Sequence, residues 1–94
     1  NLDKMTLSDK DWDGKWRIVI FDINSKKRQE RELFRKTLKK LNFLMLQRSV
    51  YLTPFKCHSE MEYLRQVCNV DTEVLILTVS ILENERAYKD YFGL

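Results

Sequence analysis

The stretch Trp-Arg-Ile-Val-Ile-Phe-Asp-Ile, residues 16–23, decides the fold of this chain. Its residues are mostly β-branched or aromatic, it contains no Gly or Pro, and apolar side chains fall on nearly both faces. This pattern predicts a central β-strand. Asn24 and Ser25 then supply turn and capping chemistry, and the run from Lys26 to Leu41 predicts a helix. The chain therefore starts as a strand followed by a helix that packs on the sheet.

The rest of the chain predicts two more strand segments and two more helices. Polar residues 47–49 interrupt the first of these strand segments, which therefore bends or breaks into two strands. Ser59 and Glu62 have capping-box spacing and begin the second helix, and Asn69 is a natural stop for it. The predicted segments are a β segment at 43–53 ended by Pro54, a helix at 59–68, a strand at 74–80 and a helix at 83–92 ended by Gly93. This order predicts an α+β fold of the ferredoxin-like βαββαβ type with a C-terminal helical tail.

Length and composition fit one domain with a small core. The chain has 94 residues, 44% of them hydrophobic, which is enough for one packed core but leaves that core marginal. Two helices can cover only one face of a sheet whose strands are apolar on nearly both, so we expect a homodimer. Residues 1–14, which carry four Asp, predict an extended lead-in or linker, and residues 15–94 predict the domain itself.

The hydropathy pattern bears on where the protein works. No apolar run approaches the roughly 20 residues that a membrane-spanning helix needs. The sequence also shows no charged-then-apolar leader with a cleavage site. We therefore expect a cytoplasmic protein without a membrane partner.

The positive charge of the chain is concentrated in the first predicted helix. Residues 26–40 contain eight Lys or Arg and two Glu, a net +6, whereas the whole chain has a net charge of only +3. On a helical wheel four apolar residues gather on one side, namely Leu33, Phe34, Leu38 and Leu41. Four cations gather on another side, namely Arg28, Arg31, Arg35 and Lys39. This basic stripe predicts phosphate contacts with nucleic acid, with a merely solvated helix face as the alternative, and its side chains should point away from the core.

Asp22 is the candidate catalytic residue and metal ligand, because it stands at the carboxyl end of the first strand, just before a helix. The alternative is a turn-forming Asp that caps backbone donors. A single carboxylate makes a poor site for a divalent metal. A site formed by two copies of Asp22 across a dimer axis would be more persuasive.

Three separated pieces of the sequence resemble the Cas2 family of CRISPR-associated proteins. They are Val-Ile-Phe-Asp-Ile at 19–23, the basic helix after it, and Leu-Gln-Arg-Ser-Val-Tyr at 46–51. The opening Trp-Asp-Gly-Lys-Trp-Arg at 12–17 and the ending with Tyr88, Phe92, Gly93 and Leu94 are similar to the C-terminal Cas2-like domain of PaaX-type transcriptional regulators. The upstream part of those regulators is a winged helix.

The resemblance implies a homodimer whose sheets face each other, with Asp22 of each chain near the two-fold axis. In an endonuclease the Asp22 pair would hold one Mg²⁺ or Mn²⁺ that activates water. In CRISPR adaptation the dimer would be a scaffold between integrase subunits and would hold spacer DNA. In a regulator the dimer would pair two upstream winged-helix domains on an operator. DNA or RNA is the expected partner in each case, and the residues expected to contact it are Lys27, Arg28, Arg31, Arg35, Lys39 and Arg48.

Overall fold

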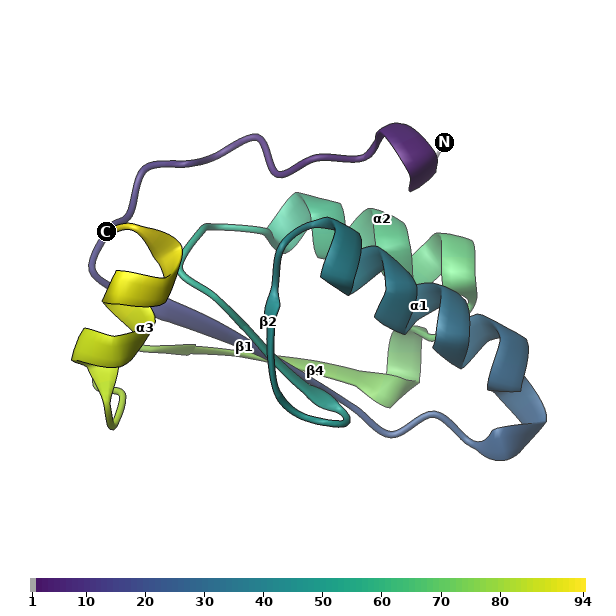
Figure 1. Cartoon of the computed structure of the whole chain (residues 1–94). Helices are drawn as coiled ribbons and strands as arrows, with labels where there is room; N and C mark the ends of the chain where they lie inside the picture. Colours follow the sequence, from purple (N-terminus) through teal and green to yellow (C-terminus); the bar gives the residue numbers. More distant parts are fainter. Residues whose placement is uncertain (1) are drawn as a thin grey trace.

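The computed structural model of the protein describes residues 2–94, which form an α+β fold around a four-stranded antiparallel sheet (Figure 1). Asn1, the first residue of the predicted lead-in, lies outside the described residues. The strands are β1 (Trp16–Phe21), β2 (Leu44–Gln47), β3 (Val50–Thr53) and β4 (Val74–Val79). They lie in the order β2-β3-β1-β4, and every neighbouring pair is antiparallel. The predicted central position of β1 and the ferredoxin-like arrangement are both confirmed. The segment predicted at 43–53 does break into two strands, β2 and β3.

Three α-helices accompany the sheet. They are α1 (Arg28–Lys40), α2 (His58–Cys68) and α3 (Glu85–Phe92), with short 3₁₀ turns η1 (Leu2–Lys4), η2 (Ser25–Lys27) and η3 (Asp71–Glu73). Figure 1 shows α1 and α2 side by side on one face of the sheet, and α3 at one end of it. Each α-helix is followed by a residue in the left-handed conformation, namely Asn42, Asn69 and Gly93. Asn and Gly tolerate this conformation best, which explains why these residues stop the helices.

The predicted capping box of α2 is wrong. The helix begins at His58, with Cys57 at the N-cap position and no side-chain hydrogen bond capping it. Ser59 therefore lies inside the first turn. Cys57 is buried in the core, so packing of this residue, rather than a capping hydroxyl, sets where the helix starts.

The main core lies between the sheet and the helix pair, and its α1 face is shifted from the predicted one. Phe34, Leu38 and Leu41 are buried as predicted, but Leu33 is 40% exposed. Thr37 is buried instead, and its hydroxyl donates to the Leu33 carbonyl (2.8 Å). The buried arc is centred on Phe34 and Leu41, so Leu33 falls at its margin.

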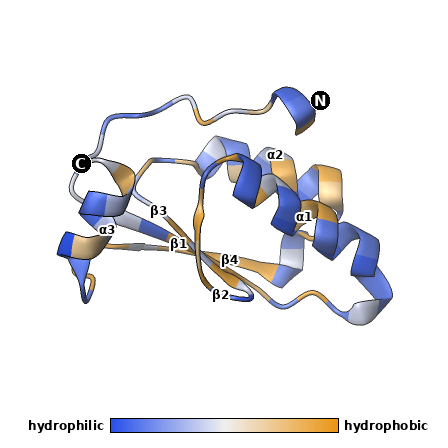
Figure 2. Cartoon of the chain, in the orientation of Figure 1, coloured by the Kyte–Doolittle hydropathy of each residue, from blue (hydrophilic) through white to orange (hydrophobic). Residues whose placement is uncertain are grey.

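The opposite face of the sheet is only partly covered. At one end, α3 packs on Trp16, whose indole N–H donates to a Glu85 carboxylate oxygen (2.8 Å). Further along β1 and β4, Leu75 pairs with Ile20 and Leu77 pairs with Ile18, so these four side chains share this face. Leu75 is 55% exposed and Leu77 is 38% exposed. Figure 2 shows hydrophobic residues along both strands.

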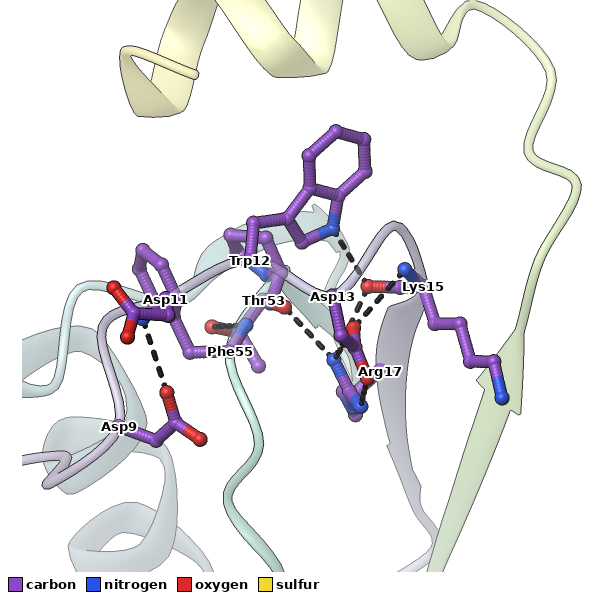
Figure 3. A network of polar contacts seen from close by, with 9 residues as sticks. Asp9, Asp11, Trp12, Asp13, Lys15, Arg17, Thr53 and Phe55 are labelled. Atoms are coloured by element: carbon purple, nitrogen blue, oxygen red, sulfur yellow. Dashed lines mark hydrogen bonds and ion pairs between the residues drawn. The ribbon is translucent and has the colours of Figure 1, made fainter.

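The segment before β1 packs on the domain. Leu7 is buried in the core, and the Ser8 backbone N–H and hydroxyl both donate to Glu60 at the start of α2 (3.0 and 2.9 Å). Nearer to β1, Asp13 accepts two hydrogen bonds from Arg17, and the Trp12 indole N–H donates to the Lys15 carbonyl (Figure 3). This segment therefore runs without regular structure after η1, yet it contributes to the core. No helix within residues 2–94 has the length and apolarity needed to cross a membrane.

Candidate nucleic-acid interface

Asp22 lies directly after β1 and is exposed to solvent. Its backbone N–H donates to the Glu73 carbonyl (2.9 Å), which ties the end of β1 to the start of β4. Its carboxylate caps no backbone donor of residues 2–94; the side chain that caps the following turn belongs to Asn24, which accepts from the Lys26 N–H (2.9 Å). The turn-capping alternative for Asp22 is therefore wrong, and its carboxylate is available to other groups.

The described residues of one chain form no cluster of ligands for a divalent metal. Across residues 2–94, no three His, Cys, Asp or Glu side chains are grouped so that they could hold an ion. The carboxylate of Glu73, next to Asp22 in space, is engaged by Lys27 (2.7 Å) and by Thr72 (2.9 Å). A metal at Asp22 would need ligands from outside this chain, and a second copy of Asp22 is the group that the sequence predicts.

The six cations predicted to contact nucleic acid fall into two groups in the structure. Three of them are paired. The Lys27 ammonium binds Glu73 and the Asn69 carbonyl (2.8 Å), and Arg31 and Arg35 both bind Glu32. The other three make no ion pair with any described residue; they are Arg28, Lys39 and Arg48. Unpaired cations are the ones most available for phosphate.

Arg35 departs from the prediction that the stripe points away from the core. Its side chain is only 11% exposed, and its guanidinium lies 5.7 Å from the centre of the Phe21 ring, in a cation–π arrangement. On the helical wheel Arg31 and Arg35 border the apolar arc, and their long stems can therefore lie along the core while the charge reaches its rim. Arg31 is also partly buried and donates to the Ile23 carbonyl (3.4 Å).

Glu32, one of the two acidic residues in the basic helix, binds two cations of the stripe. Its two carboxylate oxygens accept from Arg35 (2.8 and 2.7 Å), and one of them also accepts from Arg31 (3.3 Å). The hydrogen bond from Arg35, followed by its charge, lowers the pKa of Glu32 below its usual value. Glu32 is thus ionised at neutral pH and neutralises part of the stripe. The spacing from Glu32 to Arg35, three residues on one helix, is the signal that could have found the pair.

A hollow of about 360 Å³ lies beside this cluster, between α1 and the β2–β3 hairpin. Three cations from two elements line it, with Lys39 and Arg35 from α1 and Arg48 from the turn between β2 and β3. The remaining lining residues are Glu32 and Met45. The fold therefore brings Arg48 to the same place as two cations of the stripe, which the sequence alone did not show.

The sheet order, the two helices on one face and the exposed Asp at the end of β1 define a Cas2-like ferredoxin-fold domain. The match of a family model, described as the PaaX protein central Cas2-like domain, covers residues 9–90. The chain belongs to this family. The description gives the place of the domain in PaaX proteins as central, whereas the sequence resemblance implied a C-terminal one. No curated protein sequence matches the chain.

Proposed function

We propose that this chain is a nucleic-acid-contacting domain that acts as a homodimer within a PaaX-type transcriptional regulator. The observation that carries the proposal is the gathering of unpaired cations at α1 and the β2–β3 turn, on a chain whose net charge is only +3. Membership of the PaaX family favours a regulator over a CRISPR-associated protein, and it lends no support to an integrase partner. In a regulator the dimer would hold two DNA-reading domains at a fixed spacing, so that they reach two half-sites.

The half-covered sheet supports the dimer. Ile18, Ile20, Leu75 and Leu77 form an apolar surface on the face that α1 and α2 leave open, and a second copy of the same surface would cover it symmetrically. Light scattering should then report twice the chain mass of 11.4 kDa. A monomer at tens of micromolar concentration would overturn the dimer.

The salt dependence of DNA binding tests the nucleic-acid contacts. Two copies of Arg28, Lys39 and Arg48 offer six unpaired cations. If about four of them touch phosphates, log K against log salt should fall with a slope of roughly −3 to −4 for duplex DNA. The affinity should be similar for unrelated sequences, because phosphate contacts position a protein without reading bases. Fluorescence anisotropy with labelled duplexes measures the salt slope and the affinities for unrelated sequences. A flat salt dependence would show that the stripe is only a solvated surface.

A metal-dependent nuclease is the second candidate, and the observation that favours it is the exposed, uncapped carboxylate of Asp22 at the end of β1. In this candidate two copies of Asp22 would hold one Mg²⁺ or Mn²⁺, which would supply the means to activate water and to offset charge at a phosphate. Asp22→Asn should abolish metal-dependent cleavage while leaving the dimer and its melting temperature nearly unchanged. No cleavage by the wild type across metals and pH rejects this candidate, and equal cleavage by Asp22→Asn points to a contaminant.

A further inference from the structure

The hollow between α1 and the β2–β3 hairpin holds more positive charge than its neighbours neutralise. Arg35, Lys39 and Arg48 line it, and Glu32 is the one acidic residue among the lining residues. Neither Lys39 nor Arg48 has an ion-pair partner in the described part of the chain. Cations brought together without counter-charges repel one another, and an anion in the hollow would relieve this repulsion.

The guanidinium of Arg35 is incompletely matched by Glu32. Both short contacts to the Glu32 carboxylate come from one terminal nitrogen, Nη1, rather than from two parallel N–H groups. The Nε of Arg35 is buried and finds no hydrogen-bond partner in the part of the chain that the structure describes. Arg normally binds a carboxylate or phosphate through two parallel N–H groups. The Arg35 guanidinium therefore still has an N–H group, at Nε, that could donate to another acceptor.

Tyr51, close to Arg35, is a second buried polar group whose hydrogen bonding is incomplete. It is fully buried on β3, directly across from Met45, so that the two side chains share the face on which the hollow lies. Its hydroxyl makes no hydrogen bond of full geometry with a described residue, although the Arg35 guanidinium lies close enough to act on it by charge and by a weak hydrogen bond. Buried donors without partners are rare in folded proteins and costly. The unpaired Nε of Arg35, a residue that lines the hollow, therefore indicates that an acceptor-rich group fits there.

We infer that this hollow binds one phosphate of a nucleic-acid backbone, and that Glu32 is an internal counter-ion which the phosphate displaces from Arg35. The inference rests on the nucleic-acid binding proposed above. A phosphodiester carries one negative charge and several acceptor oxygens, which suit the Arg35 fork and the ammonium of Lys39 together. The Glu32 side chain is 49% exposed, so its carboxylate can turn to solvent and remain hydrated when it is displaced. Arg48 then closes the hollow from the hairpin side.

Removing the internal competitor should therefore tighten binding. Glu32→Gln should raise the affinity for a labelled 20-base-pair duplex about three- to tenfold at low salt, because the phosphate no longer competes with a carboxylate for Arg35. Glu62→Gln is the matched control. Glu62 also pairs with an Arg three residues later on its helix, Arg65 (3.7 Å), and it is 48% exposed, but it lies on α2 and does not line the hollow. The control should leave the affinity almost unchanged.

A second pair of variants tests the cationic side of the hollow. Arg48→Gln should weaken binding and reduce the steepness of the salt slope by about one for each contact that is lost. Lys36→Gln removes the same charge from α1 at an exposed position that does not line the hollow, and it should have a smaller effect. Equal effects of Glu32→Gln and Glu62→Gln, or of Arg48→Gln and Lys36→Gln, would show that only net charge matters and would overturn the inference.

A titration with inorganic phosphate separates this inference from the proposed function. The Nε–H signal of Arg35 in ¹H–¹⁵N NMR should shift as phosphate is added, and the Nε–H signal of Arg65, which is also buried without a partner, should not. If the wild type binds no duplex but the Arg35 signal shifts, the proposed function fails and the phosphate site stands, for a smaller ligand. A second outcome is that the wild type binds the duplex, the Arg35 signal does not shift with phosphate, and Glu32→Gln binds the duplex no more tightly than the wild type does. Nucleic-acid binding then stands, and the hollow is not part of it.

Discussion

Arg17 is a charged residue in β1, one of the two inner strands of the sheet, and its surroundings explain how the fold tolerates it. Only 7% of the residue is exposed. Its guanidinium makes two short contacts with Asp13 (2.6 and 2.8 Å) and donates to the carbonyls of Pro54 (2.9 Å) and Lys15 (3.2 Å) (Figure 3). A buried cation is stable only when it is paired and hydrogen-bonded in this way. The same contacts fasten the segment before β1 to the loop after β3.

The Asp13–Arg17 pair makes stability depend on pH in the acid range. The hydrogen bond from Arg17 holds the pKa of the Asp13 carboxyl far below its usual value. A lowered pKa in the folded state gives a stabilisation that is complete above the unfolded pKa and is lost as the pH falls towards the folded one. The free energy of unfolding should therefore decline progressively below about pH 4.

Asp13→Asn should cost about 1–2 kcal/mol at pH 7, since the carboxylate is partly exposed while the guanidinium that it leaves behind is buried. The loss relative to the wild type should shrink as the pH falls below about 4. Asp11→Asn, two residues earlier and exposed, is the control and should cost little at any pH. Urea unfolding followed at a series of pH values measures all three proteins, and a pH-independent difference for Asp13→Asn would contradict the electrostatic account.

At the scale of single elements, α1 packs on the sheet with one face and presents cations on the adjoining face. Phe34, Leu38 and Leu41 pack on the sheet, while Arg31 and Arg35 border them and bind Glu32. Because the cations next to the core are partly buried, they support the fold as well as carrying charge. The helix therefore cannot be divided into a structural face and a functional face that vary independently.

Arg35→Glu should destabilise the protein by about 2–3 kcal/mol, because it would place a carboxylate in a largely buried position next to Glu32. Arg28→Glu changes the same charge at an exposed position of the same helix and should cost less than about 0.5 kcal/mol. Thermal unfolding by circular dichroism would compare them. Equal melting temperatures would mean that Arg35 leaves the Phe21 ring in solution and is as free as Arg28. A loss of DNA binding by Arg35→Glu has to be judged against its stability for the same reason.

The elements were predictable because each has a local signal. The apolar run at 16–23 identified β1, the polar break at 47–49 located the hairpin, and Asn69 and Gly93 marked helix ends. The hollow was not predictable, because Arg48 and Arg35 come together only once β2 and β3 are paired beside α1. The partial burial of Arg35 was missed for a related reason. A helical wheel gives the direction of a side chain, but not how far neighbouring strands extend over it.

At the scale of the whole molecule, the two faces of the sheet are covered unequally. The helix side is closed by α1 and α2, with Leu7 from the segment before β1 completing the core. On the other side, α3 covers the end at Trp16, where the rings of Trp12, Tyr88 and Phe92 lie 5.3–6.3 Å from the Trp16 ring. Beyond this cluster the apolar surface around Leu75 and Leu77 is left to solvent in a single chain. Burying it in a dimer would add apolar contact to a small core.

A dimer formed through this surface would make thermal stability depend on protein concentration, because unfolding would then also separate the two chains. The melting temperature should rise with concentration for the wild type. Leu75→Glu should abolish this dependence and give a monomer by light scattering. It should still fold, since Leu75 is more than half exposed in one chain and a glutamate there can reach water. Val67→Glu is the control. It makes the same kind of change at a 45% exposed position on α2, in the helix layer on the other side of the sheet, and it should keep the concentration dependence.

A melting temperature that stays constant over a hundredfold range of wild-type concentration, together with the mass of one chain, would show that the open face does not join two copies. If Val67→Glu rather than Leu75→Glu gave the monomer, the interface would lie on the helix side of the sheet. The expectation that the two Asp22 carboxylates meet near the dimer axis would then lose its basis.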